Sequence, residues 1–487
     1  MGRLNINNFS PAERGTVALV TLLTLIHLLV AGQFELSGDE SHYVLYAYHL
    51  DWSYFDHPPL VGWILATVLP FSDSEFALRL WPIALSVISS WLLYRLTQRL
   101  YPESSPWVPA IAVALLQSSI IFHLLSLALL PDTPLLTLGL ASALLLHRAV
   151  IDGEHRTWLW IGLLFGLAGL SKYTAVLLVM STLLLIVWGG WRQLLNPWLW
   201  IGVALAALLI TPVLWWNYSN DWISFLYQFN HGMPQSGWSI KRLGISFAGQ
   251  LITYGPLLVI SGIAAGIAGL RESKHRFVLL MALPLLLFFG WNSGYELSLP
   301  HWTLLGWALL LPLSAHWLVS NQHLRTVRLL IWGGAIYSAL LLTILLSSLF
   351  QPWLPFEEGQ YPLADLYGWK QTAQRAVVLA AEHPTKDGDT PAIFAGNWSF
   401  ASHIAWYARP VPVRVTDKQY SQSDIWFGAP QAGEQGILVV PAQFRDNRDS
   451  NGLNHFRQCD LLERIPVILN EKTATSNELY YCQGYIE

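Results

Sequence analysis

The sequence predicts a helical, multi-pass membrane protein that ends in a smaller α/β domain. Of the 487 residues, 53% are hydrophobic and only 12% are charged, and the mean hydropathy is +0.40. This composition is typical of membrane proteins and excludes an ordinary soluble enzyme. Apolar runs of about 20 residues, the length of a membrane-crossing helix, recur up to residue 350. Residues 351–487 are more polar and contain short β-like runs.

The apolar runs predict about eleven transmembrane helices within a membrane domain of residues 1–350. Helices are expected because an isolated strand in lipid would leave its backbone groups unpaired. The first run is of spanning length, so we expect it to be retained rather than cleaved as a signal peptide. The runs cover residues 14–34, 76–97, 107–124, 128–147, 157–171, 174–190, 198–216, 246–270, 277–291, 301–319 and 328–350.

The basic residues predict the orientation of these helices. With the N-terminus inside, the cytoplasmic segments carry most of the Lys and Arg residues, as the positive-inside rule requires. The outer connections carry only Arg79, Lys172, Lys241 and Arg242. This orientation puts the loops 35–75 and 217–245, and the whole of 351–487, on the non-cytoplasmic side.

The C-terminal segment is predicted to form a small α/β domain. Its β-like runs are "PAIFAG", "GILVVPAQF", "RIPVIL" and "NELYYCQGY", separated by turn-rich stretches. Cys459 and Cys482 could form a disulfide in an oxidising compartment, with a pair of free thiols as the alternative. The net charge of −4 offers no basic surface for nucleic acid.

The loop 35–75 gathers ionisable groups at the outer end of the first helix. If residues 39–50 form a helix, Asp39, His42, Tyr43 and Tyr46 share one face. A carboxylate beside apolar walls can accept a proton from an attacking hydroxyl or amine. The alternative is a solvated loop with an N-capping aspartate.

The stretch "WSYFDHPPLVGW" places Asp56 and His57 before two prolines. The prolines can simply turn the chain back toward the membrane. An acid and an imidazole could also bind phosphate or a metal ion. A divalent metal at Asp56 and His57 is therefore one possibility, and no cofactor is otherwise indicated.

Two further stretches place single charges among apolar residues. Asp132 lies in "LLPDTPLL", where a charge near lipid is costly and indicates a site, although a polar turn cap is the alternative. Lys172 and Tyr173 lie in "GLSKYTAVLL". A lysine at the membrane boundary suits a lipid phosphate, with simple snorkelling as the alternative.

Other outer residues add cations and an imidazole to the same rim. Lys241 and Arg242 lie in the 217–245 loop, after "NHGMPQSGWSI". His301 begins a predicted helix, where an ordinary interfacial residue is the alternative. Together the acids, cations and aromatic rings predict an active site at the outer membrane–water boundary, reached by a lipid-borne substrate.

Five motifs taken together resemble a known family: "DE" after the first helix, "HLDWSYFDHPPLVGW", "PDTPL", "LSKYT" and "LPHWTL". They are similar to bacterial membrane glycosyltransferases of the protein O-mannosyltransferase-like and lipid A aminoarabinose transferase-like group, which have the GT-C fold. The resemblance covers the membrane portion and extends to the C-terminal α/β domain. It implies a polyprenyl-phosphate sugar donor, inverting transfer, and a periplasmic active site in the bacterial inner membrane.

The resemblance also implies roles for individual residues. Asp39 matches the general base, Glu40 stands beside it, and Asp132 matches a second acid. His57 stands where the aminoarabinose transferases have a phosphate-contacting lysine, and Asp56 stands where they have a glutamate. Binding of donor phosphate or substrate is expected from the remaining outer residues Tyr43, Lys172, Tyr173, Lys241, Arg242 and His301. Before "LPHW", Ser298 replaces a lysine of several relatives.

Two other classes of function remain open from the sequence. A lipid-linked-sugar flippase or transporter would carry polar groups through the middle of its helices. A scaffold protein would leave the outer acids without a purpose. The sequence specifies neither the sugar nor the acceptor, which could be lipid A, core oligosaccharide, another glycolipid, a polymer or a protein.

Overall fold

The computed structural model describes residues 9–189, 191–232, 237–357, 359–384, 390–447 and 451–486. The chain divides into two compact units. The helical unit contains the chain up to Leu28, His57–Val61 and Arg79–Leu346. The α/β unit contains Leu29–Asp56, Gly62–Leu78 and the chain from Ser347 on.

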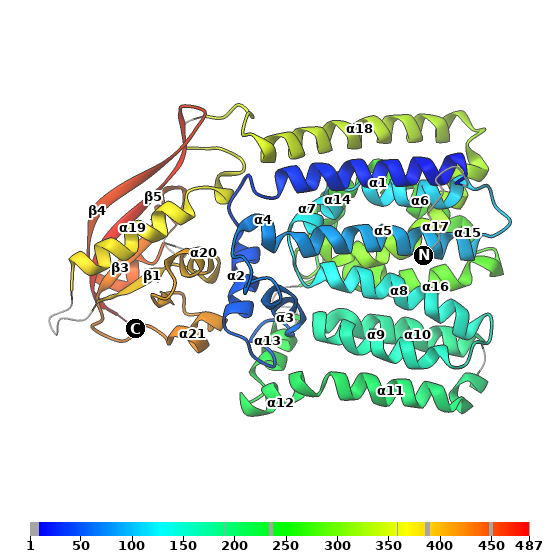
Figure 1. Cartoon of the computed structure of the whole chain (residues 1–487), viewed down its shortest axis with the longest axis horizontal. Coiled ribbons are helices and arrows are strands. Elements are labelled where there is room, and N and C mark those ends of the chain that lie inside the picture. The colour runs from blue at the N-terminus through cyan, green and yellow to red at the C-terminus, as the bar shows by residue number, and fades with distance from the viewer. Residues whose placement is uncertain are drawn as a thin grey trace. The chain divides into compact units, whose positions relative to one another are not determined.

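Within the described residues, seven helical spans are long and apolar enough to cross a membrane. Most of them run alongside one another in Figure 1. The helices in these spans are α1 (Pro11–Val30), α4 with α5 (Glu75–Leu78 and Leu80–Leu100), α8 (Asp132–Val150), α11 with α12 (Pro197–Leu209 and Thr211–Ser219), α16 (Arg276–Asn292), α17 (Leu304–Asn321) and α18 (Arg325–Phe350).

Two further spans are broken, which gives up to nine if each bent pair crosses once. Helices α6 (Trp107–Gln117) and α7 (Ile120–Leu127) meet at 71°, and α14 (Ile240–Tyr254) and α15 (Pro256–Gly269) meet at 114°. The sharper bend has a local cause, because Gly255 adopts φ +85° and Pro256 begins the next helix.

The predicted runs 157–171 and 174–190 are also helical, as α9 (Thr157–Ser171) and α10 (Val176–Gly189). Both are shorter than a full span. The predicted membrane-helix fold is therefore confirmed, whereas the count of about eleven spans stays a prediction. Helix α13 (Ile223–Gly232) follows α12 in the helical unit.

Small residues allow α9 and α11 to pack closely. Gly162 and Gly202 face each other, and a Cβ added at Gly162 would overlap the backbone of Gly202. Such close approach is how membrane helices gain packing energy, since lipid supplies no hydrophobic drive between them.

The α/β unit is built on a five-stranded sheet of order β2-β1-β3-β5-β4. The pairs β1–β2 and β1–β3 are parallel, whereas β3–β5 and β4–β5 are antiparallel. The four β-like runs all form strands, as predicted, and the short β2 was missed. The strands are β1 (Ala392–Ala395), β2 (Val413–Val415), β3 (Gly436–Pro441), β4 (Phe456–Leu469) and β5 (Lys472–Tyr485).

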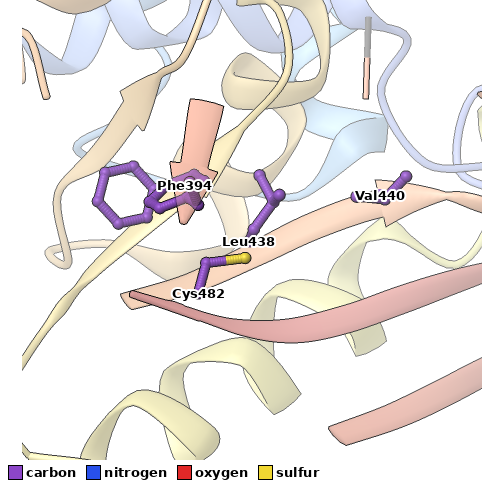
Figure 2. Close-up of a cluster of buried hydrophobic side chains, with 5 residues drawn as sticks. Phe394, Leu438, Val440 and Cys482 are labelled. Atoms are coloured by element: carbon purple, nitrogen blue, oxygen red, sulfur yellow. The ribbon is translucent and has the colours of Figure 1, made fainter. Parts of the chain in front are cut away.

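The core of this unit lies against the sheet. Figure 2 shows Phe394, Leu438, Val440 and Cys482 in one cluster of buried side chains, which also contains Phe456. Cys482 is bonded to Cys459 on the neighbouring strand, so the predicted disulfide is confirmed. The helices of the unit include α2 (Gly38–Tyr48), α3 (Leu60–Ala66, which begins in the helical unit), the short α4, α19 (Trp369–Glu382), α20 (Trp398–Ala408) and α21 (Gln422–Phe427).

Substitution of Gly162 by alanine tests the α9–α11 contact. We expect Gly162→Ala to destabilise the protein by about 1–3 kcal/mol, because the added methyl group overpacks against backbone that cannot rotate away. The midpoint of thermal unfolding in detergent measures this. Gly266→Ala is the matched control, since that helical glycine has nothing within 4 Å of an added Cβ. An unchanged midpoint for Gly162→Ala would contradict the packing argument.

Candidate functional site

The helical unit brings Asp132 and Lys172 into a buried ion pair. Lys172 Nζ donates to Asp132 Oδ1 at 2.8 Å and to Oδ2 at 2.7 Å. The two side chains are only 8% and 7% exposed. Because each charge compensates the other, neither charge is unpaired in this buried site of low dielectric constant.

The positions of these residues in their helices favour the same charges. Asp132 begins α8, whose N-terminus carries a partial positive charge, and Lys172 directly follows the C-terminus of α9. Ser171 Oγ also donates to the carbonyl of Pro131 at 2.6 Å, which fastens the end of α9 to the start of α8. The ion pair is thus fixed by backbone geometry on both sides.

Two imidazoles and an indole surround this pair. His301 Nε2 lies 3.7 Å from Asp132 Oδ2, and His57 interacts electrostatically with the same carboxylate. The Lys172 ammonium lies 5.8 Å from the centre of the Trp302 ring. An ammonium group has three N–H donors, so two bonds to Asp132 leave one for an anionic ligand.

The helical unit also contains an apolar cavity, and Tyr173, the residue after Lys172, is one of the residues that line it. It has a volume of about 510 Å³ and is lined by side chains of α9, α10 and α11, including Phe165, Tyr173 and Trp200. The Tyr173 hydroxyl is bonded to Ser224 Oγ at 2.6 Å. Lys172 thus belongs to an ion pair, whereas its neighbour Tyr173 lines an apolar cavity.

The other predicted cations are placed differently. Arg242 donates from Nε to the carbonyl of Gly294 at 3.0 Å and from Nη2 to the carbonyl of Gly237. Lys241 is exposed on α14. Arg242 therefore binds backbone carbonyl groups, and neither Arg242 nor Lys241 belongs to the cluster around Asp132.

In the α/β unit, Asp39 and Glu40 lie in the first turn of α2. The helix considered from the sequence at this position is therefore present. Glu40 forms a capping box with Ser37: its carboxylate accepts from Ser37 N at 3.0 Å, and Ser37 Oγ accepts from Glu40 N at 3.4 Å. This pattern satisfies backbone donors at a helix start. Glu40 thus has a structural role, whereas the half-buried Asp39 is not part of the box.

His42 links α2 to two other parts of the α/β unit. Its Nδ1 lies 3.1 Å from Ser402 Oγ on α20, and its Nε2 lies 3.1 Å from Asp56 Oδ2. Ser402 Oγ donates to the carbonyl of Trp398, so its oxygen can accept from His42. Both ring nitrogens of His42 are thus within hydrogen-bond distance of oxygen atoms.

Tyrosines complete the surroundings of Asp56. Tyr46 Oη donates to Asp56 Oδ1. Burial raises the pKa of Tyr46 well above its usual value, and the Asp56 carboxylate raises that pKa further, so the phenol remains a donor. The ring of Tyr43 contacts both His42 and Tyr46 edge-on, at centroid distances of 5.6 and 5.4 Å. The predicted shared face of α2 is thus present.

The predicted metal possibility at Asp56 and His57 gains no support. Asp56 is bonded to His42 and Tyr46. Across the described ranges, no group of three or more His, Cys, Asp or Glu side chains could hold a metal ion. Sequence reasoning did not identify the bonds of His42, although the helical spacing of His42 and Tyr46 was visible.

Comparisons with known proteins found a family model, a sequence relative and several solved structures that this chain resembles. A family model described as dolichyl-phosphate-mannose-protein mannosyltransferase matches residues 56–216. The lipid A galacturonosyltransferase RgtD of Rhizobium johnstonii is 22% identical over 421 residues, which cover 83% of each chain.

Among solved structures, the chain resembles ArnT from Cupriavidus metallidurans over nearly its full length. The apo structure has a TM-score of 0.61 at 14% identity and covers 96% of this chain and 98% of ArnT. The structure bound to undecaprenyl phosphate has a TM-score of 0.63 at 14% identity and covers 95% and 97%. An Archaeoglobus fulgidus oligosaccharyltransferase has a TM-score of 0.50 at 11% identity, covering 88% and 70%. These likenesses show the fold.

Removing one partner of the Asp132–Lys172 pair should be costly. We expect Lys172→Met to lower the free energy of unfolding by about 3–5 kcal/mol, because an unpaired buried carboxylate remains. The double variant Asp132→Asn/Lys172→Met should lose less than the sum of the two single variants. Thermal or denaturant unfolding in detergent measures the cycle. Strictly additive losses would show that the two side chains are not coupled.

Proposed function

We propose that this chain, a GT-C glycosyltransferase of the protein O-mannosyltransferase-like and lipid A aminoarabinose transferase-like group, moves a sugar from a polyprenyl-phosphate donor to a glycolipid acceptor such as lipid A. The observations that carry this proposal are a buried cation, Lys172, and an apolar cavity within the same helical unit. Lys172 is bonded to the Asp132 carboxylate. The cavity lies between α9, α10 and α11 and is lined by Tyr173, the residue after Lys172. A lipid phosphate needs both features.

Asp39 acts as the general base in this proposal. It takes a proton from the acceptor hydroxyl or amine, and the acceptor atom attacks the anomeric carbon of the donor sugar. The bond between that carbon and the phosphate oxygen breaks, and the polyprenyl phosphate leaves with the bonding electrons. The configuration at the anomeric carbon is inverted because a single displacement occurs.

The leaving phosphate requires cations rather than a proton. Lys172 is suited to this role because Asp132 holds its ammonium in place, and the imidazoles of His57 and His301 add donors around the same carboxylate. The apolar cavity would take part of the prenyl chain. No nucleotide enters this scheme.

The transporter alternative expects polar groups within the helices. The described helices do contain a buried pair, with His27 Nε2 and His123 Nδ1 2.8 Å apart. His123 Nε2 also lies 2.8 Å from the carbonyl of Gln117, which ends α6 at the bend before α7. A broken helix leaves carbonyls that need donors, so the bend itself accounts for this pair.

Conservative variants of two neighbouring carboxylates test the base. We expect Asp39→Asn to lower the transfer rate by about 10²–10⁴-fold, the usual contribution of a general base. Glu40→Gln is the matched control, because glutamine still completes a capping box. Transfer from a synthetic polyprenyl-phosphate sugar to glycolipid, followed by mass spectrometry, measures both. Full transfer by Asp39→Asn, or its loss in Glu40→Gln alone, would reject Asp39 as the base.

The chain should reside in the bacterial inner membrane with its C-terminal domain in the periplasm. The Cys459–Cys482 disulfide supports this location, because such bonds persist in oxidising compartments. Alkaline phosphatase fused after the C-terminus should be active, and the same enzyme fused in the loop near Gly153 should be inactive. A fluorescent C-terminal green fluorescent protein fusion would place the domain in the cytoplasm instead.

A further inference from the structure

The α/β unit contains a second concave site that the proposed chemistry does not use. It has a volume of about 560 Å³ and is lined by the end of α2, the segment after α3, and Arg409. The side chains that matter are Tyr48, Phe71, Asp73 and Arg409. Phe71 is 88% exposed, so its ring is accessible to a ligand in this pocket.

Arg409 is held rigidly at one wall of this pocket. Its guanidinium carbon lies 3.3 Å from the centre of the Trp406 ring and 5.4 Å from that of Tyr48. Its Nε donates to the carbonyl of Trp406 at 2.6 Å. A guanidinium fixed in this way loses little entropy when it binds an anion.

The ionic partner of Arg409 can be displaced. Nη2 donates to Asp73 Oδ2 at 3.1 Å, but the Asp73 side chain is 68% exposed, whereas that of Arg409 is 23% exposed. Exposed ion pairs contribute little stability. Within the described part of the chain, Nη1 makes no hydrogen bond. A phosphate could therefore bind Nη1 and replace Asp73 at Nη2 in the bidentate manner that guanidinium groups favour.

We propose that the pocket formed by Tyr48, Phe71 and Arg409 binds a phosphate-bearing sugar of the acceptor glycolipid, with Arg409 contacting the phosphate. The proposal deepens the function proposed above and rests on it. The Tyr48 and Phe71 rings suit the apolar face of a sugar ring at the membrane surface.

The position of the pocket on α2 agrees with an acceptor. Asp39 lies at the start of α2 and Tyr48 at its end, which separates them by about 14 Å at 1.5 Å per residue. That distance is of the order of two linked sugars. An acceptor held by its phosphate at Arg409 would thus extend along α2 toward the proposed base.

A charge cycle on protein and ligand tests this site. The full-length protein is assayed with a phosphorylated glycolipid acceptor and with the same acceptor after phosphatase treatment. We expect Arg409→Gln to raise the KM for the phosphorylated acceptor about 10- to 100-fold, as for a lost charge-assisted hydrogen bond. The kcat and the KM for the donor should stay within about twofold. Wild type should lose the same factor on the dephosphorylated acceptor, and Arg409→Gln should not discriminate.

Asp73→Asn separates binding from a structural role. If Arg409 and Asp73 only hold the fold together, both variants break the same pair and should have the same effect. If Arg409 binds the phosphate, Asp73→Asn removes a competing carboxylate, and the acceptor KM should stay the same or fall. Arg409→Lys should retain part of the affinity. Arg375→Gln, which removes another arginine of this unit that is paired with Glu463, is the control.

Several outcomes would overturn the inference. These are a wild-type enzyme that does not discriminate the two acceptors, a rise in donor KM instead of acceptor KM, or equal effects of Asp73→Asn and Arg409→Gln. An Arg409→Gln effect that is equal on both acceptors would indicate a phospholipid contact or a structural role. The wild-type comparison remains decisive even if Arg409→Gln does not fold. Absence of any transfer by wild type would reject the proposed function, whereas transfer without phosphate discrimination would reject this site alone.

Discussion

The hydrogen bonds of His42 fix helix α2, and the proposed chemistry of the α/β unit depends on how that helix lies. His42 contacts Ser402 on α20 and Asp56 beyond the end of α2, so one imidazole ties three segments together. Gly38 at the start of α2 packs so closely on Ser399 that a Cβ would overlap it. With the capping box at its first turn, α2 is held from several sides. A general base on such a helix is already held in position, so the protein needs little rearrangement during the reaction.

The Asp132–Lys172 pair meets a different constraint, because it lies among apolar helices. Either charge alone would be expensive there, whereas the pair is neutral and placed at complementary helix ends. Neutrality has a chemical consequence. On the proposed function, a donor phosphate that approaches Lys172 would share the ammonium with Asp132 and would also depend on the imidazole of His301. Such a site can release its anionic product, since the carboxylate takes over the ammonium again.

The sequence predicted those features that arise from local patterns. The apolar runs predicted the membrane helices. Asp132 and Lys172 were identified as candidate site residues because each is a charge between apolar residues. The capping box of Ser37 and Glu40 was missed, although the two residues have its S-x-x-E spacing, because Glu40 was assigned to the catalytic site. The pairing of Asp132 with Lys172 was not predicted, because the residues are 40 positions apart and meet only when α9 packs on α8. The pocket at Arg409 was hidden for the same reason, as its residues come from three distant segments.

Two anionic substrates create a problem that a single cationic cluster could not solve. If donor and acceptor both carry phosphate, a common cluster would bind either one and form unproductive complexes. The chain instead carries cations with different surroundings in its two units. Lys172 is neutralised by a buried carboxylate, and its unit also contains the apolar cavity that we propose for the prenyl chain. Arg409 is paired with an exposed carboxylate and adjoins aromatic rings suited to a sugar. Selection between the two lipids then rests on the groups next to each cation, because the charge itself is common to both.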